Sequence, residues 1–377
     1  MAAEDYKKLS EDWSKILKLL PVGWENQARA LGALKFGRNF EGPDKLLRVL
    51  LMYFCDGSSM RETVARARAG KLTDISDVGL LKRINKCGEW LRWMSERLIQ
   101  ETAATAIPCS ALQGRRLLAI DGSVVREPGA VTSTWRVHYA LNIGTLSCDE
   151  MQITRGKEGE SLTRFAVQEG DVIIADRGFA NRRGITHVLE HGGDVLVRMN
   201  LVSLPLQDAQ DDPFVQLPHL RTLRVGQTGE WPATMQGAKG KVAVRVCAYR
   251  KTEEQRIESE RKYRQYANKK QQKLQPDTLE ATEYVVVITT LGSLNAEAIL
   301  ALYRHRWQVE LAFKRMKSLL GLGHLKKKDM EGAKAWLQGK LFVACLIERL
   351  IAEGDHFSPV DDCECHEESY PAPQSLA

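Results

Sequence analysis

The sequence predicts an α/β protein in which helices flank a mixed β-sheet and a helical region comes first. Three short segments with β propensity follow one another between residues 117 and 154, and strand-helix alternation follows between 161 and 199. This order favours a mixed sheet with helices on its faces. Apolar residues at helical spacing before residue 107 indicate that the chain begins with helices.

The N-terminal region, residues 1–110, is expected to be helical. Ser59 and Glu62 have the spacing of a capping box, which predicts a helix from Met60 to Ala69 that ends at Gly70. After a polar turn, apolar residues at helical spacing predict a second helix. Two helices joined by a short turn and carrying exposed bases resemble a helix-turn-helix DNA reader, whereas an ordinary bundle with solvated bases explains the pattern equally well. The bases in question are Arg61, Arg66, Arg68, Lys82 and Arg83.

Two predicted strands end in an aspartate. The strand over residues 117–120 leads into Asp121-Gly-Ser, and the strand over 172–175 leads into Asp176-Arg-Gly-Phe. Strands at 135–143 and 150–154 and a helix at 161–168 lie between them, and a helix at 180–190 and a strand at 195–199 follow. Open sheets bind ligands at strand ends, although an Asp beside a Gly is also common in simple turns.

Residues 201–283 interrupt this alternation. They contain β-like segments at 221–225 and 241–249 and a basic helix at 255–275. The basic helix suits either DNA contact or an ordinary solvated face. A strand at 284–290 then resumes the sheet, and helices follow at 295–319 and 333–352.

The helix predicted at 295–319 carries four polar residues on one side: Tyr303, Arg306, Glu310 and Lys317. At 100° per residue they fall within about 60° of one another. A phenol, a guanidinium, a carboxylate and an ammonium group together suit the binding of a phosphate beside a metal ion. The Arg306–Glu310 pair alone would also fit a plain i,i+4 ion pair.

Three carboxylates, Asp121, Asp176 and Glu310, come from two strands and one helix. Such a set can hold two divalent ions that support phosphoryl transfer without a covalent protein nucleophile. Oxygen ligands favour Mg²⁺ or Mn²⁺ over zinc.

These segments carry a family resemblance. Asp121-Gly-Ser, Ala175-Asp-Arg-Gly-Phe179 and the spacing Tyr-x2-Arg-x3-Glu-x6-Lys from Tyr303 resemble the DDE transposases of bacterial insertion sequences, in the group marked by a YREK motif. The resemblance spans roughly residues 40–350. It implies an RNase H-like core built from 111–200 and 284–352, a helical DNA-binding region in 1–110, and a β-rich insertion in 201–283 between the second and third acids.

The resemblance also implies roles for single residues. Asp121, Asp176 and Glu310 would be the catalytic acids and would bind two Mg²⁺ or Mn²⁺ ions. DNA phosphate would be bound by Tyr303, Arg306 and Lys317, and Arg177 is a further candidate because it adjoins Asp176. Some relatives stack a flipped base on an aromatic residue of the insertion. Tyr284 and Trp231 are the candidates here, and an ordinary core position explains either of them.

The function implied is cut-and-paste DNA transposition: the protein would bind the terminal inverted repeats of its element, cleave the DNA there and transfer the freed 3′ ends to target DNA. Its partner would be duplex DNA, and joining two ends favours a dimer on the DNA. A nuclease with the same core but without strand transfer, and a non-catalytic DNA-binding descendant, are the alternatives.

Composition agrees with a DNA partner and a bacterial cytoplasm. Residues 351–377 contain seven acids and no Lys or Arg, so the rest of the chain is more basic than its net charge of +6. We expect residues 353–377 to form an acidic, disordered tail, in which Cys363, Cys365 and His366 lack a fourth zinc ligand. Scattered cysteines, no apolar run of about 18 residues and no signal peptide predict a cytoplasmic protein without membrane contact. The resemblance implies that it is bacterial and nucleoid-associated.

Overall fold

The computed structural model describes residues 13–35, 39–55, 57–103, 112, 114–130, 134–156, 158–323, 325 and 329–355. One sequence expectation lies outside the described residues: the part of the acidic tail that contains Cys363, Cys365 and His366. The first three residues of the expected tail, 353–355, are helical instead.

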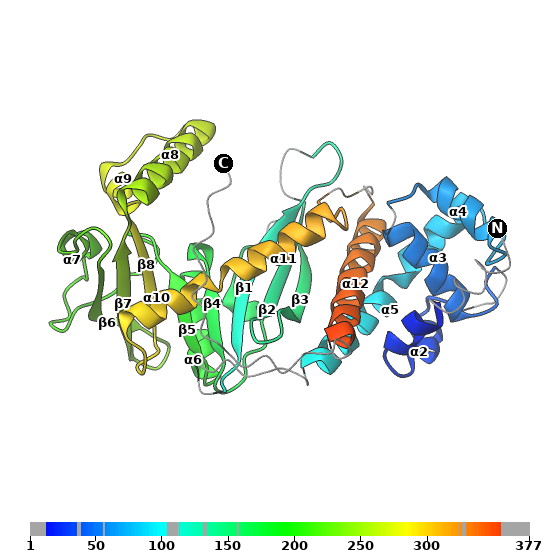
Figure 1. Ribbon diagram of the computed structural model, residues 1–377, viewed down its shortest axis with the longest axis horizontal. Coiled ribbons are helices and arrows are strands. Elements are labelled where there is room, and N and C mark those ends of the chain that lie inside the picture. Colours follow the sequence, from blue (N-terminus) through cyan, green and yellow to red (C-terminus); the bar gives the residue numbers. More distant parts are fainter. Residues whose placement is uncertain are drawn as a thin grey trace.

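An eight-stranded mixed sheet forms the centre of the molecule, in the order β3-β2-β1-β4-β5-β8-β7-β6 (Figure 1). The first three strands form an antiparallel meander, β4 and β5 run parallel to β1, and β8 and β7 continue the sheet in antiparallel fashion. This arrangement confirms the predicted fold class. The strands are β1 (Leu117–Val125), β2 (Trp135–Asn142), β3 (Ser147–Arg155), β4 (Val172–Ala175), β5 (Asp194–Arg198), β6 (Thr228–Gln236), β7 (Lys241–Arg250) and β8 (Tyr284–Thr289).

Helices cover both faces of the sheet because successive strand residues point to opposite sides. Ile120 of β1 packs in one apolar cluster with Ile185 of α6 (Arg182–Glu190). Ala119, its neighbour, belongs to the cluster on the other face, which includes Phe313 of α11 (Trp307–Ser318). The same face also carries α10 (Ala296–Arg304), and Figure 1 shows α10 and α11 running across the sheet.

The N-terminal helices pack together and against α12 (Met330–Asp355), and the last of them contacts β3 directly, as α12 does (Figure 1). They are α2 (Trp24–Ala30), α3 (Pro43–Cys55), α4 (Met60–Ala69) and α5 (Asp77–Ala103). Half-buried Glu348 of α12 connects this layer to the sheet, because it accepts hydrogen bonds from the Tyr139 hydroxyl and the Cys148 amide, both at 2.9 Å. The capping box of Ser59 and Glu62 at α4 is confirmed.

The two helices α4 and α5 have the predicted helix-turn-helix order. One of the bases expected on their exposed faces has a structural role instead: the Arg83 guanidinium donates a 2.9 Å hydrogen bond to the Ala33 carbonyl. Arg61, in contrast, has a 91% exposed side chain. DNA reading by this region stays a prediction.

Gly339 of α12 lies where the helix meets α3. A Cβ at this position would collide with the ring of Phe54, which is fully buried. We expect Gly339→Ala to lower the free energy of unfolding by about 1–2 kcal/mol, since overpacking costs about 1–3 kcal/mol and exceeds the helix-propensity gain of about 1 kcal/mol.

The matched control is Gly88→Ala in α5, where a Cβ would lie 3.4 Å from the Ala335 Cα, an ordinary contact. This variant should keep or slightly raise stability. Denaturant unfolding followed by tryptophan fluorescence measures both, and equal stabilities would show that the Phe54 contact does not limit the packing.

Two local predictions are wrong. Residues 161–168 form only a short 3₁₀ turn, Leu162–Arg164, because Leu162 and Phe165 both turn into the apolar cluster under α6. Residues 221–225 are not a strand. They begin with the last residue of helix α7 (Gln216–Arg221), and the strand that pairs with β7 is β6, an edge strand that tolerates Pro232.

The helix predicted at 295–319 is two helices, α10 and α11. Around His305 the hydrogen bonds change from i→i−4 to i→i−3: the Arg306 amide donates to the Tyr303 carbonyl at 3.1 Å, and the Val309 amide to the Arg306 carbonyl at 3.2 Å. Backbone angles stay helical, with φ −53° and ψ −30° at Arg306. Such a tightened turn rotates each residue by about 120° in place of 100°, so the predicted side-chain positions shift.

Candidate active site

Asp121 and Asp176 lie side by side on neighbouring parallel strands. Ile120 of β1 pairs with Ala175 of β4, so each aspartate is the next residue after this pair. Neighbouring strands are about 4.8 Å apart. The prediction that Asp121 ends its strand is wrong, because β1 continues to Val125 in its pairing with β2. The pairing of β1 with β4, in contrast, ends at Ile120, so Asp121 lies beside the turn that begins at Asp176.

Burial makes the Asp121 carboxylate costly to ionise. Its pKa is raised to about 6, chiefly by burial and also by the negative charges of Glu160 and Asp176. The Gly122 amide, which donates a 2.7 Å hydrogen bond to Oδ1, and the positive charge of Arg306 act in the opposite direction. Asp121 is therefore a carboxylate with less compensating positive charge than its burial requires, which suits the binding of a cation.

Glu310 lies opposite, in the first turn of α11. Its carboxylate forms a 2.7 Å ion pair with Arg306, whose side chain is only 12% exposed. Burial lowers the pKa of Arg306, but the nearby Tyr303, Glu310 and Asp176 raise it above its ordinary value. The i,i+4 ion pair considered as an alternative is thus present, and it joins two of the predicted site residues.

Three polar atoms at this site are buried without a hydrogen-bond partner among the described residues: the Tyr303 hydroxyl, Arg306 Nε and Asp176 Oδ1. The Arg306 guanidinium lies 5.8 Å from the centre of the Tyr303 ring. Burial raises the pKa of Tyr303, and Asp176 is close enough to raise it further. Buried unpaired donors and acceptors are rare in folded proteins, so this group indicates a position where a ligand supplies the missing partners.

A surface cleft of about 590 Å³ brings Asp121 of β1 together with Glu310 and Lys317 of α11. Lys317 is exposed at this cleft. Arg177 follows Asp176 directly and is also exposed. Tyr303 differs from the sequence expectation, since it is 7% exposed and does not present its phenol at the surface.

Glu160 is a neighbour of the site that the sequence did not reveal. A Cβ on Gly178 would collide with Glu160 Oε2, and a Cβ on Gly122 would lie 3.1 Å from Oε1. The Glu160 carboxylate forms a 2.9 Å ion pair with Arg136, and its negative charge raises the pKa of Asp121. Glycines after both aspartates therefore make room for a further negative charge. The glycines after the two aspartates, Gly122 and Gly178, were the available signal in the sequence, but they did not identify Glu160 as the residue that needs this space.

The two aromatic candidates, Tyr284 of β8 and Trp231 of β6, occupy different environments. Tyr284 is 3% exposed and belongs to the apolar cluster under α6, with the Arg250 guanidinium 5.6 Å from its ring centre. Trp231 is half-buried and contacts the His219 ring. The ordinary core position weighed for Tyr284 thus agrees with its surroundings.

Within the described residues, no three His, Cys, Asp or Glu side chains lie close enough together to hold a metal ion. The Arg306 pair accounts for this at Glu310, whose carboxylate is engaged. The unpartnered Asp176 Oδ1 and the destabilised charge of Asp121 nevertheless fit an ion that prefers oxygen ligands. The metal roles of the three acids stay a prediction.

Comparison with known proteins identifies the family. Residues 113–346 match the family described as Transposase DDE domain, and this range contains all the predicted site residues. The chain is 33% identical over 359 residues to the InsL protein of insertion sequence element IS186A from Escherichia coli, covering 93% of this chain and 96% of that protein.

Two further relatives extend this likeness. The transposase of IS421 from Escherichia coli is 33% identical over 360 residues, covering 93% of this chain and 96% of that protein. The transposase of IS231B from Bacillus thuringiensis is 24% identical over 366 residues, covering 86% of this chain and 76% of that protein. The family match covers more than half of the chain, and it agrees with the sheet order and with the two adjacent aspartates. The chain belongs to the DDE transposase family, whose members are metal-dependent enzymes that act on DNA.

Proposed function

We propose that this protein is the transposase of an insertion sequence, that it binds terminal inverted repeats, and that it cleaves DNA and transfers the ends to a target. The observation that carries this proposal is the pair Asp121 and Asp176 at one level of neighbouring strands, with Glu310 across the cleft. Membership of the DDE family gives this geometry its chemical meaning.

The three acids would hold Mg²⁺ or Mn²⁺, and two ions fit the chemistry. When bound, such ions polarise the phosphate and activate the attacking water or 3′-hydroxyl. The protein's own part is to place the carboxylates and to hold the DNA. Asp121 and Asp176 are fixed by strand pairing, whereas Glu310 is on a helix and is engaged by Arg306.

Arg306 and Tyr303 would bind the phosphate next to the cleaved bond. Both carry a buried polar atom without a partner, and a phosphate oxygen can accept hydrogen bonds from both. When the Arg306 guanidinium binds the phosphate, its ion pair with Glu310 breaks. The Glu310 carboxylate is then free to complete the metal site with Asp121 and Asp176. Lys317 and Arg177, which are exposed at or beside the cleft, would neutralise further phosphate charge. DNA binding thus assembles the site.

Because two ends must be joined, a dimer on DNA is the expected active form. Among the described residues no helix has the length and apolar character needed to cross a membrane. The cytoplasmic, nucleoid-associated location and the YREK subgroup stay predictions.

The test is incubation of the purified protein with DNA that carries the ends of its own element, together with a target plasmid and Mg²⁺ or Mn²⁺. We expect cleavage at the ends and joined products, both lost on chelation with EDTA and restored by Mg²⁺. Cleavage without joining would identify a nuclease. Salt-sensitive binding with no metal-dependent product would identify a non-catalytic descendant, and either result overturns the proposal.

A further inference from the structure

The insertion carries a helical arm that stands at the same edge of the sheet as the proposed active site. Here the arm means α8 (Glu253–Lys270) and α9 (Pro276–Ala281). β7, which leads into the arm, is antiparallel to β8, and β8 is antiparallel to β5. β7 therefore runs parallel to β5, β4 and β1, and its carboxyl end meets the edge that Asp121 and Asp176 occupy. Three strand spacings, about 14 Å, separate β4 from β7.

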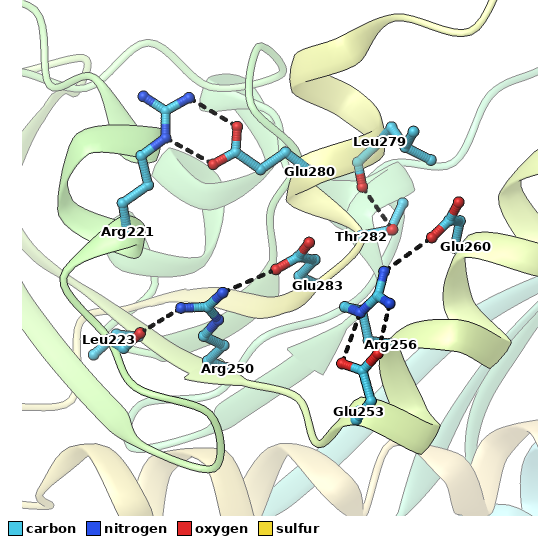
Figure 2. A network of polar contacts seen from close by, with 10 residues as sticks. All are labelled: Arg221, Leu223, Arg250, Glu253, Arg256, Glu260, Leu279, Glu280, Thr282 and Glu283. Atoms are coloured by element: carbon cyan, nitrogen blue, oxygen red, sulfur yellow. Dashed lines mark hydrogen bonds and ion pairs between the residues drawn. The ribbon is translucent and has the colours of Figure 1, made fainter.

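The base of the arm is fixed to the sheet by ion pairs (Figure 2). Arg221 binds both oxygens of Glu280 at 2.7 and 2.8 Å, and Arg250 binds Glu283 at 3.3 Å. Lys251, the first residue after β7, donates to the Thr282 carbonyl and, at 2.8 Å, to Ser259 of α8. The arm thus holds a defined direction from the sheet edge, as Figure 1 also shows.

One side of α8 is neutral because its acids and arginines pair with each other. Arg256 binds Glu253 and Glu260, as Figure 2 shows; Arg264 also binds Glu260, and Arg261 binds Glu258. Only Ala267 of α8 is buried, so this helix does not serve the core.

The other side is a lysine stripe, defined as Lys262, Tyr266, Lys269 and Lys270. At 100° per residue these four fall within about 100° of arc, and Ser259, which contacts Lys251, lies at the same azimuth. Lys262 forms a 3.1 Å ion pair with Glu258, whereas Lys269 and Lys270 are exposed and form no ion pair with any described residue. Tyr266 is 49% exposed. The stripe therefore runs from the strand end at Lys251 to the far end of the helix.

Lys251 adds a further positive charge at the base of the arm. It has no carboxylate partner among the described residues, and its positive neighbours are Arg198 of β5 and Lys262 of the stripe. Burial, together with these two cations, lowers its pKa to about 8. An anion beside Lys251 would relieve their mutual repulsion. Among the described residues, positive charge is thus uncompensated at Lys251, at the sheet edge, and at Lys269 and Lys270, at the far end of α8.

We infer that the lysine stripe binds the phosphate backbone of duplex DNA that extends from the proposed active site. An 18-residue helix is about 27 Å long, the length of about eight base pairs. Lysines bind phosphates as point charges and Tyr266 can donate a hydrogen bond, so the contact is independent of base sequence. This inference rests on the proposed function, because it takes the shared sheet edge as the place of cleavage.

The experiment compares two double variants with equal loss of charge on the same helix. Lys269→Gln with Lys270→Gln removes two cations of the stripe, and Arg261→Gln with Arg264→Gln removes two ion-paired cations of the neutral side. Binding of a 40-base-pair duplex from the element's end is measured by fluorescence anisotropy from 50 to 200 mM salt, without divalent metal. Circular dichroism checks that both variants keep their helices.

The lysine variant should bind at least about tenfold more weakly at 100 mM salt, and the slope of log affinity against log salt should become less negative by about 2. The arginine variant should bind like wild type. Equal losses in both variants, or no loss in either, would overturn the inference. Since no metal is present, this result is separate from the proposed function, which fails on its own if wild-type protein shows no metal-dependent cleavage.

Discussion

Glu310→Gln should abolish DNA cleavage and leave DNA binding intact. The substitution removes one of three anionic ligands from the proposed metal site and keeps the size of the side chain. We expect the cleavage rate to fall about a thousandfold or more, which corresponds to about 4 kcal/mol of lost transition-state stabilisation. Affinity for the element's ends should stay equal or rise, because Arg306 loses its carboxylate partner and is free for phosphate.

The control for Glu310→Gln is Glu331→Gln. Glu331 is also in the first turn of a helix, α12, and it is exposed. This change alters the net charge by the same amount and should leave cleavage at the wild-type rate. Single-turnover cleavage of labelled ends in Mg²⁺ measures both, and wild-type cleavage by Glu310→Gln would refute its catalytic role.

Arg306→Gln should lower cleavage about 10²–10³-fold, the usual loss when one donor to a reacting anion is removed. It should also weaken DNA binding, in contrast to Glu310→Gln. The physical reason is that Nε of Arg306 is buried without a partner among the described residues and that the guanidinium lies 5.8 Å from the Tyr303 ring centre, close enough to Asp176 for that charge to raise its pKa. A phosphate that lacks this partner would leave the Tyr303 hydroxyl as its remaining buried donor.

Arg304→Gln is the matched control, two residues away and exposed at the end of α10. It removes the same charge and should change neither rate nor affinity strongly. The double variant Arg306→Gln with Glu310→Gln then separates two roles of Arg306. If the arginine only holds Glu310, the double variant binds DNA as Glu310→Gln does. If it binds phosphate, affinity falls in both backgrounds. Equal behaviour of Arg306→Gln and Arg304→Gln would refute a phosphate role.

Local signals in the sequence predicted much of this structure. The run Val172–Ala175 before Asp176 is fully buried and became β4 with the predicted bounds, because a short apolar segment between turn residues has few other stable states. The capping box at Ser59 fixed the start of α4 for a similar reason. Where the chain's own residues satisfy the backbone, prediction succeeded.

Prediction failed where distant partners decide. Asp121 lies inside β1 because β2, further along the chain, continues the pairing past it. Leu162 and Phe165 are drawn into the core at the expense of the expected helix. No Gly or Pro next to His305 predicts the tightened turn at this residue. Glu160 reaches the site through a loop whose position depends on the whole fold, so no spacing in the sequence relates it to Gly122 and Gly178.

The hydrogen-bonding of β8 has a consequence for how the insertion can be handled. Since β8 pairs with β5 on one edge and with β7 on the other, residues 201–283 are woven into the same ladder as the catalytic strands. Excising them would strip β8 of one neighbour and leave a bare, aggregation-prone edge. It would also remove Val244 and Val246, and so uncover Val286 of β8, which packs with them in one cluster. Residues 201–283 therefore cannot be deleted as a separate domain could. Any motion of the arm is transmitted to the sheet that carries Asp121 and Asp176.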